Sequence, residues 1–293
     1  MVSDYCIGDV HKGNDVFSFV IVAPHDTTEN ICEYIAGAAP KDLKNTNKVP
    51  LGLVQYLACE VPVTFSVSFV MRRDAALLRN YLSVEAMSAL VAGAISFLDD
   101  RLSLYQDARD IDYHQSAIKR LSAFKRDLSH KNVNAKLARQ IHLVAAMVAT
   151  LCNMLNQAVS ARAIRWISDR DALFERHDAV VSDLAYVYYL TQAIELTTPE
   201  QRETQNIGSS LATLRFEIPE KTGKHRFDEL IRLPDYLAGT LADLDSETMA
   251  VSKEKFDVVL HSVFVNSENN WLIQLLSTDE RITARSALFR GWN

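Results

Sequence analysis

The pattern of hydrophobic positions is strand-like in the first 70 residues of the chain. Residues 16–23, Val-Phe-Ser-Phe-Val-Ile-Val-Ala, are β-branched, aromatic or small and stop at Pro24, which predicts a buried strand. Together with the opening run around Asp4, they predict a hairpin through the polar turn 11–15. Residues 61–70 alternate between apolar and polar types and predict another strand of the same sheet.

The pattern becomes helical in the middle of the chain. From Ala75 to Val159, apolar residues recur at three- and four-residue steps, with many alanines and no proline. Residues 75–104 and 137–158 are expected to be core helices, with the more polar segment 106–134 between them. We expect 75–159 to be a helical insertion within one α/β domain that spans residues 1–293.

Strand-like segments return after the helical block. Residues 164–169 form a short apolar run that ends in Asp169 and predicts a buried strand. The remaining expectations, in chain order, are a helix from Ala172 to Leu196, a strand from Ala212 to Ile218, a polar turn from Pro219 to Arg226, a helix from Asp228 to Leu244 that Asp228 caps, and a strand from Phe256 to Val265.

Acidic residues stand at the ends of three of these elements. Asp4 lies in the opening run, Asp169 ends the mid-chain strand, and Asp235 is expected at the head of a late helix. Open α/β sheets bind ligands at the carboxyl ends of their strands, so the fold has to gather these residues before they can form one site. Each also has a structural explanation: Asp4 can end a strand in solvent, Asp169 with Asp171 can cap a helix, and Asp235 can complement a helix dipole.

Composition indicates a soluble, cytoplasmic protein with a full core. The chain has 293 residues, and 48% of them are hydrophobic, so it needs no disulfide or metal to fold. Its four cysteines are scattered, with no CxxC pair and no zinc-ligand spacing, and they are expected to be reduced. No apolar run approaches the ~18 residues of a membrane span, and the first residues include acids and lack the apolar region typical of a signal peptide.

The charge is acidic overall but locally basic. A net charge of −6 argues against a general nucleic-acid coating protein. Between Gln115 and Arg139, however, basic residues are opposed only by Asp127. Such a stretch is either an ordinary solvated helix surface or a patch that faces phosphates. The candidate nucleic-acid contacts are Lys119, Arg120, Lys125 and Arg126, and the stretch also contains Lys131, Lys136 and Arg139.

Four motifs in order resemble a known family. They are Asp4-Tyr5-Cys6-Ile7-Gly8, Asp42-Leu43-Lys44, the strand-end Asp169, and Arg232-Leu233-Pro234-Asp235-Tyr236-Leu237-Ala238-Gly239. This order resembles the RNase H-like domain-of-unknown-function family 3800, whose members carry Asp-Glu-Ser-Gly, a Glu-x-Lys loop, an Asp that ends a mid-chain strand, and a Gln-x-x-Asp-x-x-Ala-Gly helix. The chain departs from that pattern at Tyr5, at Asp42, at Arg232 and in a Gly that comes one residue late.

The resemblance implies an RNase H-like mixed sheet flanked by helices, and a nuclease that hydrolyses RNA or DNA in defence or mobile-element biology. Such nucleases use Mg²⁺ or Mn²⁺, which carboxylates and water bind well. By resemblance, Asp4, Asp169 and Asp235 bind the metal, Asp42 completes the ligand set, and Lys44 contacts the scissile phosphate or the nucleic-acid backbone. Two alternatives remain: a degenerate RNase H-like module that binds nucleic acid or a protein partner, and a helical scaffold in which the three acids lie far apart.

Overall fold

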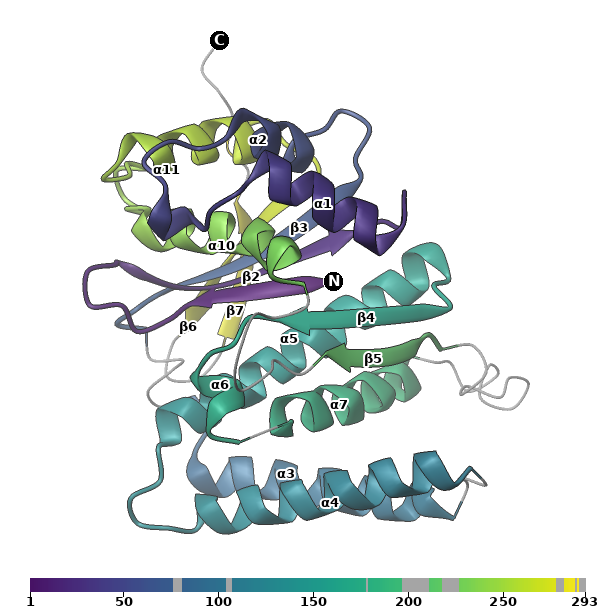
Figure 1. Ribbon diagram of the computed structural model, residues 1–293. Coiled ribbons are helices and arrows are strands. Elements are labelled where there is room, and N and C mark those ends of the chain that lie inside the picture. The colour runs from purple at the N-terminus through teal and green to yellow at the C-terminus, as the bar shows by residue number, and fades with distance from the viewer. Residues whose placement is uncertain are drawn as a thin grey trace. The chain divides into compact units, whose positions relative to one another are not determined.

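A seven-stranded mixed sheet, in the order β5-β4-β1-β2-β3-β6-β7, is the centre of the fold (Figure 1). The α/β class expected from the sequence is confirmed. The computed structural model describes residues 1–75, 81–103, 107–177, 179–196, 211–217, 227–277, 282–287 and 289, so the expected turn 219–226 lies outside the described residues. The strands are β1 (Val2–Cys6), β2 (Asn14–Val22), β3 (Thr64–Arg72), β4 (Ala163–Ser168), β5 (Thr213–Glu217), β6 (Asn270–Ser277) and β7 (Ile282–Ala287).

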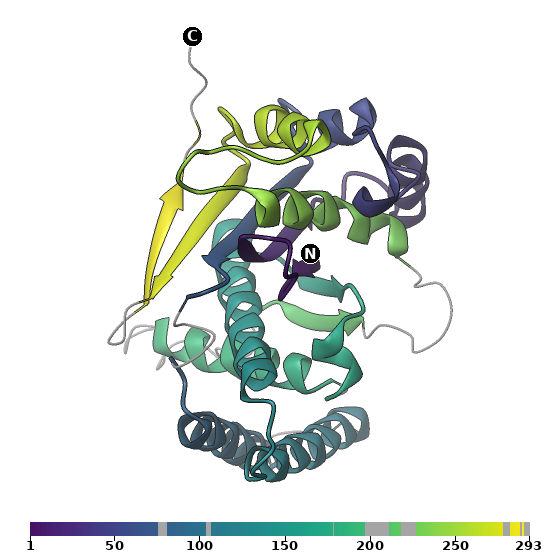
Figure 2. The ribbon, with the colours of Figure 1, turned by 90° about the vertical axis from the view of Figure 1, so that its left-hand side faces the viewer.

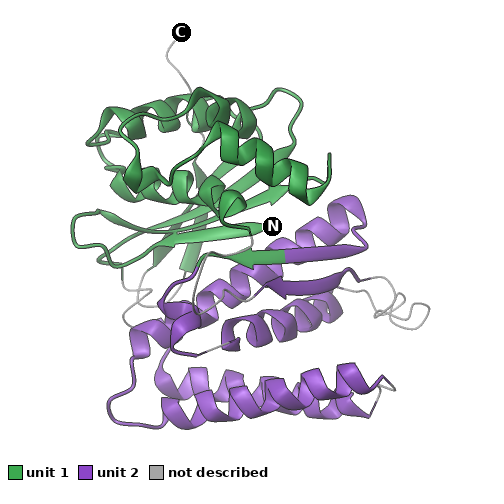
Figure 3. Ribbon diagram, in the orientation of Figure 1, with its two compact units in different colours: residues 1–77, 166–169, 219–293 green, residues 78–165, 170–218 purple. Residues whose placement is uncertain are grey.

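The chain divides into two compact units (Figure 3). Unit 1 contains residues 1–77, 166–169 and 219–293, and unit 2 contains residues 78–165 and 170–218. The helical segment expected at 75–159 therefore falls almost wholly in unit 2, where it is joined by residues that follow the mid-chain strand. Strand β4 begins in unit 2 and ends in unit 1.

Unit 1 is built on the predicted hairpin. Strand β2 pairs antiparallel with both β1 and β3, and β1 pairs parallel with the end of β4. On the other side, β3 pairs parallel with β6, which pairs antiparallel with β7. The helical elements of this unit are α1 (Thr28–Ala38), a 3-10 helix at Leu43–Asn45, α2 (Leu51–Leu57), α10 (Asp228–Asp243), α11 (Glu254–Val259) and a π-helix at Leu260–Phe264.

The helices of unit 1 cover one face of its strands (Figures 1 and 2). Side chains alternate between faces along a strand, so Val2 and Asp4 of β1 point to the same side. Val2 belongs to a core cluster that includes Val16 and Val20 of β2 and the buried leucines of α10. Asp4 is therefore a polar residue on the face that α10 covers.

Unit 2 is mainly helical. Its helices are α3 (Val84–Leu102), α4 (Ala108–Leu128), α5 (Ala135–Val159), α6 (Ala172–Glu175) and α7 (Val180–Leu196). Helix α5 is the one helix of the described residues that is long and apolar enough to cross a membrane, but more than half of its apolar window is buried inside the structure. Such burial is typical of a core helix, and the compact α/β structure is consistent with a soluble protein.

Three expectations about the later elements are wrong. The helix expected from Ala172 to Leu196 is interrupted, because Ala179 adopts a positive φ of 62° that no α-helix continues. Asp228 is the first helical residue of α10 and not its cap, which is Phe227. The segment Phe256–Val265, expected as a strand, is helical up to Phe264. Its buried residues are Phe256, Val259, Leu260, Val263 and Phe264, a helical spacing.

Candidate metal site

The pairing of β1 with β4 sets Asp4 beside Asp169. Val2 is opposite Ile167 and Ser3 is opposite Ser168 in a parallel register, and the Asp169 N–H donates to the Ser3 carbonyl at 2.9 Å. One step further along both chains, Asp4 is opposite Asp169. Val2 and Ile167 are both in the core under α10. Asp4 and Asp169 are each two residues further along, so their carboxyls point to the same face, which α10 covers.

Helix α10 brings Asp235 to the same place. Burial is the largest cause that raises the pKa of Asp4 well above its ordinary value. The neighbouring carboxylates of Asp235 and Asp169 raise this pKa further. Burial likewise raises the pKa of Asp235 to about 6, although a hydrogen bond from the Leu43 N–H opposes the shift. The three acids predicted from the sequence are therefore gathered on one face of unit 1.

Asp235 does not lie where the sequence predicts it within its helix. The helix begins at Asp228, so Asp235 is in its interior, directly after Pro234, and not in the first turn. The helix dipole therefore does not explain this acid, because that effect fades within the first turn. Pro234 lacks an N–H and withholds one hydrogen bond from the Leu230 carbonyl, four residues earlier.

The three carboxyls suit a divalent cation by their chemistry. Carboxylate oxygen is the preferred ligand of Mg²⁺ and Mn²⁺, and Asp4, Asp169 and Asp235 each keep intermediate solvent exposure, so water can complete a coordination shell. A cation would also offset the repulsion that, after burial, contributes to the raised pKa values of Asp4 and Asp235. Among the described residues, however, no three His, Cys, Asp or Glu side chains stand ready-made around a metal position.

Asp4 and Asp169 interact directly. Burial is the largest cause of the raised pKa of Asp4, and the charge of Asp169 and a side-chain hydrogen bond with it add to the shift. The two carboxyls thus suit a cation in residue type and proximity.

The loop that carries Asp42 and Lys44 is fastened to α10. The Leu43 N–H donates to Asp235 Oδ2 at 2.7 Å, which orients that carboxyl. Two further residues of α10 donate to loop carbonyls, Arg232 Nη1 to Ala39 at 2.8 Å and the Tyr236 hydroxyl to Lys41 at 3.0 Å. From α11, Lys255 Nζ donates to the carbonyls of Leu43 and Thr46 at 2.7 and 2.8 Å.

These contacts give Asp42 and Lys44 different roles. Arg232 Nε lies 3.6 Å from Asp42 Oδ1, so the Asp42 carboxylate has a cation of its own. Lys44 is exposed, and its charge lowers the pKa of Asp235 in opposition to burial and to the acids around it. The loop thus lies beside Asp235 as predicted, with Asp42 held in an ion pair and Lys44 extending into solvent.

Tyr5 lies on the opposite face of β1 from Asp4. Its hydroxyl is 2.8 Å from Ser3 Oγ and accepts a hydrogen bond from Ser168 Oγ at 3.2 Å. Trp166 Nε1 also donates to Ser3 Oγ, at 2.8 Å. The Tyr5 ring packs against Phe17 of β2. Tyr5 thus joins β1 to β4 and takes no position among the carboxyls.

The basic stretch lies on α4 and its neighbours in unit 2. Lys119, Lys125 and Arg126 are exposed, as expected of either a solvated surface or a phosphate-facing patch. Arg120 points inward, where its Nε and Nη2 donate to the two oxygens of Asp183 at 2.8 Å each. Position 120 is three residues after buried Ala117 and four before buried Phe124, a spacing that already indicates the inner face.

Sequence reasoning missed the residues that support the site. In the sequence, Arg232 stands out only as a departure from the family pattern and Lys255 does not stand out at all, because both act on backbone carbonyls of a distant loop. Comparison with known proteins gives no match, whether with family models, curated proteins or solved structures. The function is therefore inferred from the positions of the chain's own side chains.

Proposed function

We propose that this protein is a metal-dependent nuclease of RNase H type, which hydrolyses phosphodiester bonds of RNA or DNA with Mg²⁺ or Mn²⁺. The observation that carries the proposal is the meeting of Asp4, Asp169 and Asp235 on one face of unit 1. A partly buried concentration of like charge destabilises a fold and is typical of functional sites. An antiparallel β1–β2–β3 sheet extended by a parallel β4 also suits the RNase H-like assignment.

In this proposal, Asp4, Asp169 and Asp235 bind the cation and keep one another in position. Bound divalent ions supply an activated water and stabilise the leaving oxygen of the phosphodiester. The Leu43 N–H donates to Asp235 Oδ2 and so orients this carboxyl. Lys44, exposed on the same loop, offers a cation to the phosphate of an approaching strand. Arg232 and Asp42 form the ion pair that sets the path of this loop.

A second candidate is a catalytically degenerate RNase H-like module that binds nucleic acid or a protein partner. Two observations favour it. Asp42 is already neutralised by Arg232, and no metal-ready group of three ligands is found among the described residues. In that case the carboxyl cluster is a remnant, and binding resides in other surfaces such as the exposed lysines of α4.

A nuclease assay separates the two candidates. Purified wild type is incubated with single- and double-stranded RNA and DNA in Mg²⁺ or Mn²⁺, beside Asp169→Ala and the exposed control Asp257→Ala. We expect cutting by wild type and the control, and a loss of roughly 100-fold or more in Asp169→Ala, because a metal ligand is removed. Equal cutting by all three proteins would remove the catalytic role, and no cutting by any of them would favour the binding module.

A further inference from the structure

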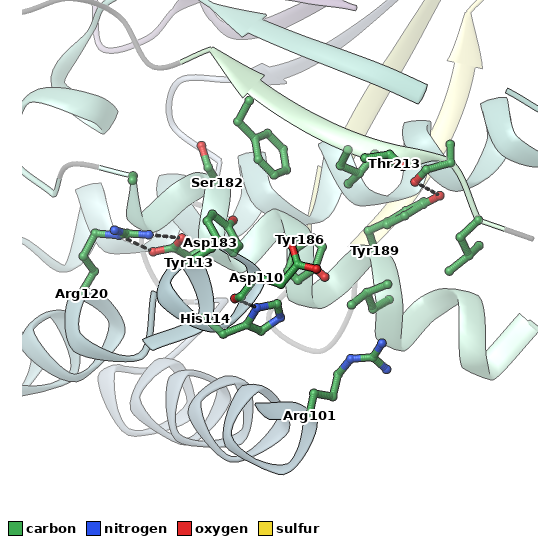
Figure 4. Close-up of a pocket in the computed structure, with 16 residues that line it drawn as sticks. Arg101, Asp110, Tyr113, His114, Arg120, Ser182, Asp183, Tyr186, Tyr189 and Thr213 are labelled. Carbon is green, nitrogen blue, oxygen red and sulfur yellow. Dashed lines mark hydrogen bonds and ion pairs between the residues drawn. The ribbon is translucent and has the colours of Figure 1, made fainter. Parts of the chain in front are cut away.

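Unit 2 contains a cavity that has no part in the proposed nuclease chemistry. Its volume is about 580 Å³, within the range of small-molecule pockets. Helices α4 and α7 supply most of the lining, and β5 contributes Thr213, Leu214 and Phe216 (Figure 4). All of its lining residues belong to unit 2.

Aromatic rings form one wall of the cavity. Tyr113, His114 and Tyr186 contact one another edge to face, with ring centroids 5.6 to 5.9 Å apart and planes 76° to 86° apart. His114 is buried and its Nδ1 lies 2.7 Å from the Asp110 carbonyl, so the ring is fixed. Tyr113, by contrast, is 36% exposed. A rigid aromatic group with an accessible ring provides a surface on which a planar molecule can pack.

The charges that line the cavity compensate one another. They are Arg101, Asp110, Arg120 and Asp183, two of each sign. Asp183 is 1% exposed and accepts hydrogen bonds from Nε and Nη2 of Arg120. The two residues therefore neutralise each other and form a fixed polar group in the cavity wall. In Figure 4, Arg120 lies to the left of Tyr113 and His114, and Arg101 lies below and to the right of them.

Uncharged hydrogen-bonding groups also line the cavity. The Ser182 side chain is almost fully buried and lines the cavity, and the Tyr189 hydroxyl donates to the Ala212 carbonyl at 3.2 Å, which ties α7 to β5. Thr213 adds an exposed hydroxyl. A compact set of donors and acceptors beside aromatic rings suits the edge of a polar heterocycle better than an aliphatic chain.

We infer that this cavity binds an uncharged planar heterocycle of nucleoside size, with the ring packed on the Tyr113–His114–Tyr186 wall. The balanced charge disfavours a polyphosphate, which would need uncompensated cations, and the polar lining disfavours a lipid chain. The inference does not rest on the nuclease proposal, since no residue of the carboxyl cluster takes part.

Titration calorimetry with the full chain tests this site. The probes are adenosine, guanosine, cytidine and uridine, each beside its 5′-monophosphate, and inorganic phosphate alone. The test variant is Tyr113→Leu, and the control is Tyr81→Leu, an exposed tyrosine of the same unit that does not line the cavity. Both variants are first compared with wild type in a thermal melt.

We expect at least one nucleoside to bind, with its affinity reduced roughly tenfold or more in Tyr113→Leu and unchanged in Tyr81→Leu, because a stacked ring loses its support. If Tyr113→Leu melts well below wild type, Thr213→Val replaces it and is expected to weaken binding through the lost hydroxyl. Absence of nucleoside binding at millimolar concentration, binding of phosphate alone, or equal weakening by the control would overturn the inference.

Discussion

At the scale of single residues, the main finding is that three acids distant in sequence share one environment. The sequence predicts their identity from strand ends and motif order, and the register of β1 with β4 places two of them as expected. It predicts poorly which polar residues pair with one another. The spacing of Arg120 from Ala117 and Phe124 indicates the inner face of α4, but its partner Asp183 lies on another helix, and the sequence does not identify it.

The raised pKa values make a prediction about stability. Burial raises the pKa of Asp235 from 3.8 to about 6, so between these values the folded protein binds more protons than the unfolded chain. This carboxyl therefore lowers the free energy of unfolding as the pH rises through that window. We expect Asp235→Asn, which keeps an oxygen to accept from Leu43, to raise that free energy at pH 8 by about 1 kcal/mol after solvent screening, and to change little at pH 4.

Urea unfolding at the two pH values measures this effect. The control Asp257→Asn removes a carboxylate that is 58% exposed, and it should behave like wild type at both values. If Asp235→Asn were no more stable than wild type at pH 8, burial would not raise the pKa of the Asp235 carboxyl as described.

At the scale of elements, α10 determines the site because it carries Asp235 and holds the loop. Hydrophobic spacing predicts this helix over 228–244, close to its actual bounds, but Asp235, expected at its head, lies in its interior. The segment 256–265 is wrongly predicted as a strand, because a short apolar run fits both the helical and the strand pattern of hydrophobic residues. Only packing against the core resolves such a run.

The end of α10 depends on a side chain from the hairpin. Asn14 is buried on β2, and its Nδ2 donates to the carbonyls of Leu241 at 3.0 Å and Leu244 at 2.6 Å. We expect Asn14→Ala to lower the free energy of unfolding by about 2 kcal/mol, because the carbonyls of Leu241 and Leu244 each lose a buried hydrogen bond. The exposed Asn30→Ala should cost no more than about 0.5 kcal/mol in the same denaturant titration. Equal effects would mean that Asn14 does not cap the helix.

The basic surface of α4 makes a separate prediction about binding. We expect Lys125→Glu with Arg126→Glu to weaken nucleic-acid binding and to flatten its salt dependence, because phosphate contacts release counterions. A matched double reversal, Arg215→Glu with Lys253→Glu, changes the net charge equally at exposed positions outside that stretch. Fluorescence anisotropy at several salt concentrations reports both quantities. If the two double variants behaved alike, α4 would be ordinary solvated surface.

At the scale of the whole molecule, each unit carries one candidate site. The carboxyl cluster belongs to unit 1 and the aromatic cavity to unit 2. Composition and periodicity predict the mixed α/β class and the helical block within it. They do not predict the cavity, because its walls come from α4, α7 and β5, and apolar spacing does not show which helices pack together.

The central claim is that Asp4, Asp169 and Asp235 share a divalent cation, and calorimetric titration with Mn²⁺ measures this directly. The claim predicts that wild type and Asp257→Asn bind Mn²⁺, that Asp4→Asn and Asp169→Asn lose this binding, and that affinity rises with pH as the Asp4 carboxyl, whose pKa is raised, loses its proton. Wild type that binds no Mn²⁺ at millimolar concentration, or Asp4→Asn and Asp169→Asn that bind it as wild type does, would contradict the claim.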